Sequence, residues 1–201
     1  MSIAQQSMSS VRKTQQAMSV VAEVSGEWVA QPPAPRPISA VRGRMRVPAD
    51  GPLVAYESAL ERDFLMFCRT DHRVRSVQAQ QLRLHYTERR TGKRRRYTPD
   101  FVVRLHSAPE AAPLCWVIEV KRREDMFRGR PAIRGAYAAA RVWASQQQAA
   151  RFTLVTNQAM SGYWLENTRL LSGALDGLNE SRPATLGIQP TNLAAGSVMA
   201  N

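Results

Sequence analysis

The stretch Tyr97-Thr98-Pro99-Asp100-Phe101 opens a predicted strand that runs from Arg96 to Leu105. Proline has no N–H to donate, so Pro99 requires an edge, bulged or first position in that strand. The next strand, Leu114 to Lys121, is almost continuously apolar, as a buried central strand should be, and ends in Glu119-Val120-Lys121. Because side chains alternate along a strand, Glu119 and Lys121 share one face.

A helix is predicted upstream, from Tyr56 to Arg69, with its apolar side chains gathered on one side. Glu57 falls on or near that apolar face, and Glu61 falls at its edge. A carboxylate that faces a core is costly unless it is paired or bound to a metal. Either glutamate could instead cap the helix or pair with an arginine such as Arg62.

The other predicted elements form an α/β pattern around these stretches. They are extended segments at Val74–Gln80 and Gln81–Thr87, a hairpin turn at Glu88–Arg95, a helix from Pro131 to about Ala150, a strand at Phe152–Thr156 and a last helix at Tyr163–Leu175. Prolines and polar residues predict a flexible Pro- and Arg-containing arm over 1–54, with a short strand or partner-binding segment at Val20–Val29. The folded domain is then expected over 55–176, with a flexible tail over 177–201.

The chain is strongly basic, with a formal net charge of +12 over 201 residues. Such an excess suits a polyanion, above all nucleic acid, although a merely solvated basic surface is the alternative. Like charges concentrated on one hairpin repel each other unless a polyanion receives them. The residues expected to hold a DNA duplex are Arg89, Arg90, Lys93, Arg94, Arg95, Arg96, Arg122 and Arg123.

The two cysteines, Cys68 and Cys115, lie on different predicted elements and form no metal-binding motif. We expect reduced thiols in a cytosolic protein. The apolar runs are far shorter than the roughly 20 residues that a membrane span needs. The polar start of the chain has no apolar core of a secretory signal.

The carboxylates point to phosphodiester chemistry. Mg²⁺ prefers oxygen ligands, and it can activate a water and neutralise charge on a phosphate. Asp100 and Glu119, on neighbouring strands, can converge on one ion, and Glu61 can complete the site together with the carbonyl of Val120. Lys121 can orient the attacking water or stabilise the developing charge. The expected cofactor is Mg²⁺, with Mn²⁺ as a substitute.

Read in order, the motifs resemble the N-terminal catalytic domain of TnsA-type transposon endonucleases, within the PD-(D/E)xK nucleases. The resemblance rests on Ser58-Ala59-Leu60-Glu61, Val77-Gln78-Ala79-Gln80, Arg96-Tyr97-Thr98-Pro99-Asp100-Phe101 and Ile118-Glu119-Val120-Lys121. It implies a restriction-endonuclease-like core, with a mixed central β-sheet flanked by helices. It also implies Glu61, Asp100 and Glu119 as metal carboxylates and Lys121 as the catalytic lysine, with Gln80 in a supporting role. Glu57, because of its place on the apolar face of the helix, is a second candidate for a supporting role.

The same resemblance implies a heteromeric cut-and-paste transposase. This subunit would cut DNA at the 5′ ends of the transposon, a DDE-type transposase subunit would act at the 3′ ends, and an AAA+ ATPase would regulate both. The protein would then be bacterial, cytoplasmic and nucleoid-associated. Family members often carry a C-terminal helical domain that engages the ATPase, whereas here a polar stretch follows Leu175. We therefore expect that contact in another segment, such as the N-terminal arm, or a different partner.

Two other functions fit the same residues. One is a stand-alone nuclease of restriction, repair or Holliday-junction type, which would act on DNA without partners. The other is a non-catalytic DNA-binding or assembly protein built on a decayed nuclease fold. The intact set of Glu61, Asp100, Glu119 and Lys121 favours an active enzyme.

Overall fold

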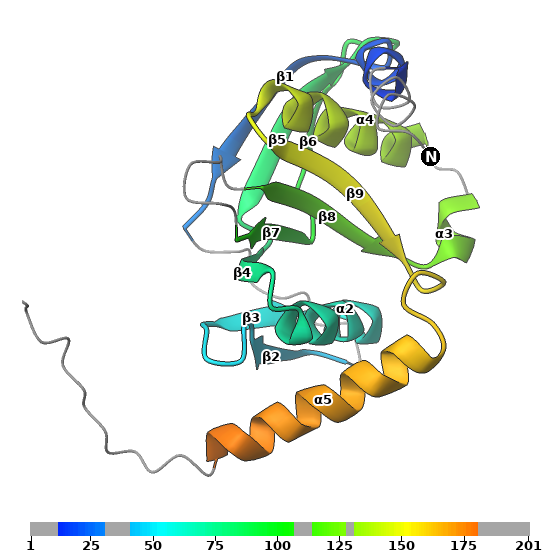
Figure 1. Cartoon of the computed structure of the whole chain (residues 1–201). Coiled ribbons are helices and arrows are strands. Elements are labelled where there is room, and N and C mark those ends of the chain that lie inside the picture. The colour runs from blue at the N-terminus through cyan, green and yellow to red at the C-terminus, as the bar shows by residue number, and fades with distance from the viewer. Residues whose placement is uncertain (1–11, 31–40, 107–113, 128–130, 181–201) are drawn as a thin grey trace, which may run out of the picture.

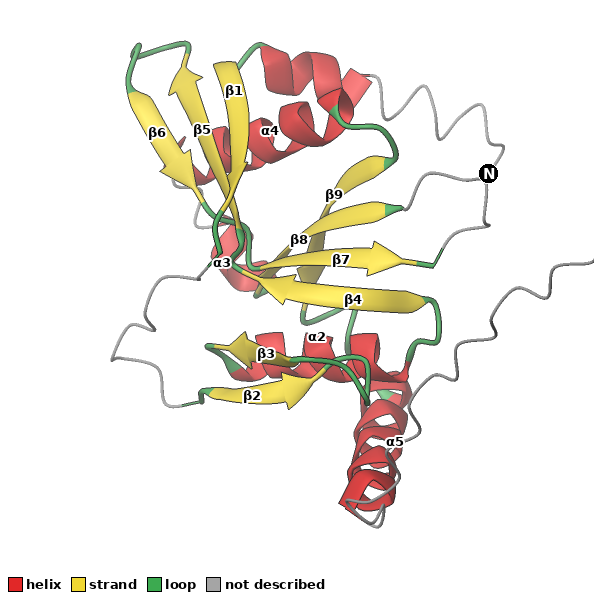
Figure 2. Cartoon of the chain, turned by 90° about the vertical axis from the view of Figure 1, so that its left-hand side faces the viewer, coloured by secondary structure: helices red, strands yellow, loops and turns green. Residues whose placement is uncertain are grey.

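The computed structural model describes residues 12–30, 41–106, 114–127 and 131–180, and its centre is a mixed four-stranded sheet. The strands lie in the order β4 (Val74–Ala79), β7 (Phe101–Leu105), β8 (Cys115–Lys121) and β9 (Ala150–Thr156). The first three are antiparallel neighbours, and β8 and β9 are parallel. Figure 2 shows this sheet between helices above and below it. The predicted α/β class with a mixed central sheet flanked by helices is confirmed, and the arrangement is consistent with a restriction-endonuclease-like core.

One face of the central sheet packs against α4 (Pro131–Gln146) and a second sheet. That second sheet is antiparallel, in the order β1 (Val21–Trp28), β5 (Leu82–Glu88) and β6 (Arg94–Tyr97). Val102 and Val117 from the central sheet meet Leu84 from the second sheet and Trp143 from α4 in one buried cluster. The second sheet and α4 therefore enclose this face of the central sheet (Figure 1).

The other face is covered by α2 (Ala59–Thr70), together with the two-stranded sheet of β2 (Gly43–Arg46) and β3 (Leu53–Tyr56). Phe64 of α2 stacks on Phe101 of β7, with ring centroids 5.4 Å apart. The last helix, α5 (Tyr163–Glu180), packs against α2. α5 extends beyond Leu175, where the sequence predicted the helix to end. Residues 181–201, most of the predicted tail, lie outside the described residues.

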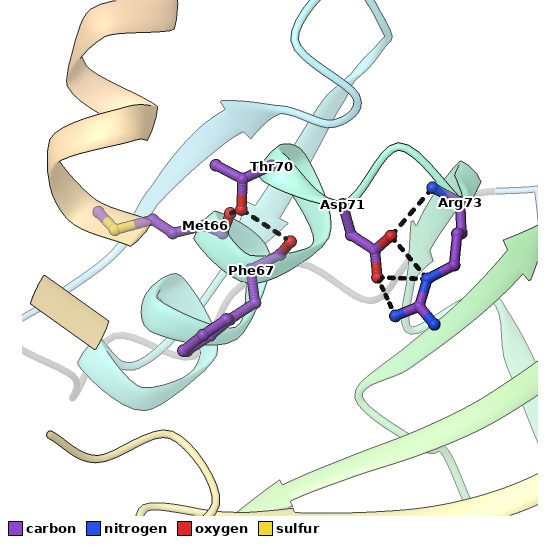
Figure 3. Close-up of polar contacts among 5 residues, drawn as sticks. All are labelled: Met66, Phe67, Thr70, Asp71 and Arg73. Atoms are coloured by element: carbon purple, nitrogen blue, oxygen red, sulfur yellow. Dashed lines mark hydrogen bonds and ion pairs between the residues drawn. The ribbon is translucent and has the colours of Figure 1, made fainter. Parts of the chain in front are cut away.

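Both ends of α2 are held by local hydrogen bonds. At the N-terminus, the Ser58 hydroxyl accepts from the Glu61 N–H at 3.1 Å. At the C-terminus, the Asp71 N–H donates to the Phe67 carbonyl, and the Thr70 hydroxyl donates to the carbonyls of Met66 and Phe67. The carboxylate of Asp71 also binds the Arg73 guanidinium, at 2.7 Å to Nη2 (Figure 3). The helix thus enters and leaves at defined residues, as its capping chemistry requires.

The predicted strand from Arg96 to Leu105 is two strands in different sheets. β6 ends at Tyr97 in the second sheet, and β7 begins at Phe101 in the central sheet. Pro99 lies between them and is fully buried. Its missing N–H and fixed φ explain the break, because a ladder cannot continue through proline.

The N-terminal stretch departs from the flexible arm that the sequence predicted. Within 1–54 the described residues form a helical segment over 12–18, β1, β2 and the start of β3. β1 pairs with β5 along its length, with an irregularity at Glu23, whose φ is +52°. The polar and proline-rich composition of 1–54 did not indicate this structure, because β1 gains its stability from pairing and packing rather than from its own apolar content. Residues 1–11 and 31–40 lie outside the described residues.

Gly26 tests whether β1 is an integral part of this fold. A Cβ added at Gly26 would lie 2.3 Å from the indole nitrogen of Trp143. We therefore expect Gly26→Ala to lower the free energy of unfolding by about 1–3 kcal/mol through overpacking, as measured by urea denaturation. The neighbouring Ser25→Ala, at an exposed position, serves as the matched control. Equal stability of the two variants would mean that β1 does not dock on α4.

Candidate active site

Asp100 and Glu119 lie side by side at one end of the central sheet. Phe101 pairs with Ile118 across β7 and β8, so Asp100, the residue before Phe101, stands next to Glu119. The backbone N–H of Val120 donates to Oδ2 of Asp100 at 2.7 Å. Glu119 is buried, at 8 % exposure. A glutamate side chain in water is charged at neutral pH, so burial at this position is unusual. The register of two neighbouring strands therefore brings together the carboxylates that the sequence singled out.

Gln80 supports Asp100 through its backbone. The Gln80 N–H donates to the Asp100 carbonyl at 2.9 Å, and Gln80 adopts a left-handed conformation with φ of +51°. A residue other than glycine is disfavoured in the left-handed region unless surrounding contacts impose this conformation. Gln80 was predicted to support the site, and the contact found here is made by its main chain.

Glu61 occupies the first turn of α2, where it forms with Ser58 a variant of the capping box, in which the glutamate binds the N–H of Glu57 and not that of Ser58. Its Oε1 accepts from the Ser58 hydroxyl at 3.0 Å, and its Oε2 accepts from the Glu57 N–H at 2.8 Å. The sequence Ser58-Ala59-Leu60-Glu61 has the spacing that this motif requires. Capping was one of the two roles left open for a glutamate in this helix. The same side chain also lies close enough to Asp100 and Glu119 to raise the pKa of each.

Burial and mutual repulsion govern the protonation of the three carboxyls. Burial raises the pKa of Asp100 well above its usual range, and the charges of Glu119 and Glu61 raise it further. Burial also raises the pKa of Glu119, against the lowering effect of a Tyr97 hydrogen bond and of the Lys121 charge. The pKa of Glu61 is raised chiefly by burial as well, and Lys121 again opposes the rise. Lys121 is thus the cation common to all three groups.

Two tyrosines join this site that the sequence did not identify as functional. The Tyr97 hydroxyl donates to Oε2 of Glu119 at 2.6 Å, and the Tyr137 hydroxyl donates to Oε1 at 3.5 Å. Their rings meet edge to face, with centroids 6.2 Å apart. Tyr97 comes from β6 and Tyr137 from α4, so only the packing of three separate elements brings them to Glu119. The one sequence signal was the place of Tyr97 beside Pro99-Asp100.

The donor set suits Mg²⁺, because carboxylate oxygens are the ligands that this ion prefers. Within the described residues, however, no three His, Cys, Asp or Glu side chains are grouped so that they could hold a metal ion. Glu61 is occupied by its capping hydrogen bonds and Glu119 by the tyrosines. Holding an ion would require these side chains to exchange hydrogen bonds for metal coordination, while Asp100 keeps its contact with Val120. The carbonyl of Val120 stays a predicted ligand.

The basic residues predicted to bind DNA do not form one surface. Side chains alternate along β6, so Arg95 shares the face of Tyr97, toward α4, whereas Arg94 and Arg96 point to the opposite face. Arg90, Lys93 and Arg122 are exposed. Three of the predicted residues make contacts within the fold, and one of these is the ion pair of Arg95 with Glu88 at 3.5 Å. Nε of Arg89 donates to the carbonyls of Met18 and Val21, and the Arg123 N–H donates to Oδ1 of Asn157.

The raised pKa of Asp100 has a consequence for stability. The folded protein binds the proton of the Asp100 carboxyl more tightly than the unfolded chain does. The contribution of this proton to the free energy of unfolding is therefore fully present below the unfolded pKa and is lost as pH rises through the folded pKa. We therefore expect Asp100→Asn to stabilise the metal-free protein at pH 8 by about 1 kcal/mol or more, because a buried charge is removed. The gain should vanish below about pH 3, where the Asp100 carboxyl is protonated in both the folded and the unfolded state. Thermal melting across this pH range measures it.

Asp63→Asn is the matched control. Asp63 is also buried, but its carboxylate accepts from Arg62 at 3.2 Å and from Arg169 at 3.1 Å. Loss of a carboxylate with two arginine partners should destabilise the protein. If both variants melted below the unmodified protein at pH 8, the electrostatic reading of Asp100 would be wrong.

Comparison with known proteins agrees with this geometry. Residues 71–157 match the family model described as TnsA-like endonuclease N terminal. The matched range contains Asp100, Glu119 and Lys121, and α2 with Glu61 precedes it. A search of curated proteins found no match. No helix in the described ranges is long and apolar enough to cross a membrane. Residues 71–157 of this chain are therefore similar to the N-terminal domain of TnsA-like endonucleases.

Proposed function

We propose that the protein is a Mg²⁺-dependent DNA endonuclease that works as one subunit of a heteromeric cut-and-paste transposase. A TnsA-type endonuclease domain implies a nuclease role in transposition and a DNA substrate. The observation that supports catalysis is the placement of Asp100 beside Glu119 at the ends of β7 and β8, with Glu61 and Lys121 near enough to influence the pKa of both carboxyls. Clusters of perturbed carboxyls mark functional sites because an ordinary fold avoids their cost.

In this proposal Glu61, Asp100 and Glu119 hold the ion, and the carbonyl of Val120 adds a further oxygen. When bound, Mg²⁺ would supply positive charge that polarises the phosphodiester and lowers the pKa of a coordinated water. The Val120 N–H fixes the orientation of Asp100. Tyr97 and Tyr137 fix that of Glu119. The contact of Asp100 can persist when an ion binds, whereas Glu119 would exchange its tyrosine hydrogen bonds for coordination.

Lys121 has a separate role. It ends β8 two residues after Glu119, on the same face, and is half-buried. An ammonium group in this position stabilises negative charge as it develops on the phosphate in the transition state, and it can orient the attacking water. Lys121 also moderates the mutual repulsion of the carboxylates before an ion binds.

The family suggests the place of this chemistry. We propose that the subunit cuts at the 5′ ends of the transposon, beside a DDE-type transposase subunit, under an AAA+ ATPase regulator, in a bacterial nucleoid. An endonuclease domain fits the proposed transposase complex because it would contribute the activity that cuts one of the two DNA strands. A stand-alone nuclease is the alternative, and it would cleave DNA in the absence of any partner.

Metal binding tests the site without requiring the partners. We expect isothermal titration calorimetry to detect Mn²⁺ binding to the unmodified protein and to find it lost in Asp100→Ala and weakened at least tenfold in Glu61→Gln, because each removes a carboxylate charge from the ion. Glu166→Gln, at an exposed position of α5, should leave the affinity unchanged. Equal Mn²⁺ affinity in all four proteins would remove Glu61 and Asp100 from the proposed site.

The pH dependence of the same titration follows from the raised pKa values of Asp100 and Glu119. An ion must displace any proton on these groups, so Mn²⁺ affinity should rise with pH until both are ionised. We expect at least a tenfold increase between about pH 6 and about pH 8, with protons released into the buffer. Affinity that does not vary over this range would mean that the ion binds elsewhere.

Cleavage is then measured in the presence of the partner subunits. With Mg²⁺, the complex should nick the 5′ ends of a transposon substrate, and Lys121→Ala should lower the rate by at least about a hundredfold, as removal of one stabilising group does elsewhere. Lys121→Ala should still bind Mn²⁺. Metal binding without any cleavage in the complete complex would favour a non-catalytic DNA-binding assembly protein.

A further inference from the structure

A basic groove runs along α4 on the side of the second sheet. It consists of two adjoining hollows, of about 460 Å³ and about 180 Å³. Arg134 and Val20 line both hollows, so the two lie next to each other. The walls come from the β5–β6 hairpin, from α4, and from the helical segment 12–18 with the two residues after it. Figure 1 shows these three parts together at the top of the molecule.

The charge of this groove is almost entirely positive. The larger hollow is lined by Arg90, Lys93 and Arg95 of the hairpin together with Arg134. The smaller hollow is lined by Lys13, Arg134 and Arg141, and by no carboxylate among its described residues. Glu88 is the acidic residue in the lining of the larger hollow, and it is already engaged by the Thr91 hydroxyl at 2.8 Å and by Arg95 at 3.5 Å. A polyanion would therefore meet an excess of positive charge in both hollows.

The walls of the groove are fixed by contacts within the fold. Arg89, at the base of the hairpin, donates to the carbonyls of Met18 and Val21 and so holds the N-terminal segment against the hairpin. Gly135 lies in the floor, where a Cβ would come within 3.2 Å of the Tyr86 ring. The absence of a side chain at Gly135 lets α4 approach β5 and leaves room above it. Arg89 thus shapes the groove rather than lining it.

One residue of the groove contacts a candidate catalytic carboxylate. Tyr137 lies in the lining of the smaller hollow, one helical turn beyond Arg134, and its hydroxyl contacts Glu119. A strand that occupies the smaller hollow therefore lies against the residue that contacts Glu119. Such an approach suits an extended backbone with regularly spaced negative charges better than a compact anion.

We infer that this groove, with Arg134 at its junction, binds the phosphate backbone of DNA and guides one strand to Glu119. The inference rests on the proposed nuclease function, and it adds Lys13 and Arg134 to the hairpin residues as phosphate contacts. Positioning by phosphate contacts carries no sequence information, so the groove binds duplexes of different sequence alike.

The test measures DNA binding without cleavage. The full chain is titrated into a fluorescein-labelled duplex of arbitrary sequence in EDTA, by anisotropy, over a series of salt concentrations. Each phosphate contact contributes about 0.9 to the slope of log K against log salt, so Lys13→Ala/Arg134→Ala should lower the magnitude of the slope by about 1.8. The loss should be the same for a second, unrelated duplex. Arg141 is left unchanged because its guanidinium also lies over the Phe152 ring, 5.8 Å from its centroid.

The control is Arg44→Ala/Arg75→Ala, which removes two exposed arginines on β2 and β4 that do not line the groove. This variant should keep both the affinity and the slope, and melting curves check that both double variants are folded. Equal slopes for the two double variants would overturn the inference. It would also be overturned if the unmodified protein bound polyglutamate as tightly as the duplex, since the groove would then serve an acidic protein. Because no metal is present, failure of catalysis does not affect this readout.

Discussion

The passage of the chain from one sheet to another at Thr98-Pro99-Asp100 is the constraint on which the site depends. Pro99 cannot donate a ladder hydrogen bond, so β6 ends before it in the second sheet and β7 begins after it in the central sheet. As a result Tyr97 and Asp100, only three residues apart, reach the end of β8 from two different sheets. Tyr97 donates to Glu119, and Asp100 accepts from Val120. A strand that continued without a break would have placed Tyr97 far along the sheet from Asp100.

The carboxylates at this position destabilise the protein as long as no cation joins them. Burial raises the pKa of Asp100, of Glu119 and of Glu61, which means that the fold disfavours their ionised forms. An ordinary core would avoid this arrangement. The fold tolerates it because extensive apolar packing on both faces of the central sheet supplies the remaining stability, and because Lys121 offsets part of the repulsion. A bound divalent cation would reduce the energetic cost of the ionised carboxylates.

Glu61 connects the site to the helix that covers the other face of the sheet. Its carboxylate closes the capping box at the start of α2, and it also acts on the charges of Asp100 and Glu119. A structural and a functional role for one side chain are compatible here, since the capped N-terminus holds Glu61 at the end of the sheet where the other carboxylates lie. On the opposite side, Tyr137 links Glu119 to α4 and to the basic groove. The site is therefore held from both layers of the molecule.

The sequence by itself determined the local features of this protein. Strand alternation placed Glu119 and Lys121 on one face, the proline restricted the strand beside Asp100 to an edge, bulged or entry position, and helix capping was one of two roles open to Glu61, because each depends on neighbours within a few residues. Only the tertiary structure decided that β6 and β7 belong to different sheets and that β1 is part of the fold. It also decided that Tyr97 and Tyr137 meet at Glu119, and that Arg89 supports the fold while Arg134 faces the groove. These features depend on contacts between residues far apart in the chain, which packing selects and no local pattern encodes.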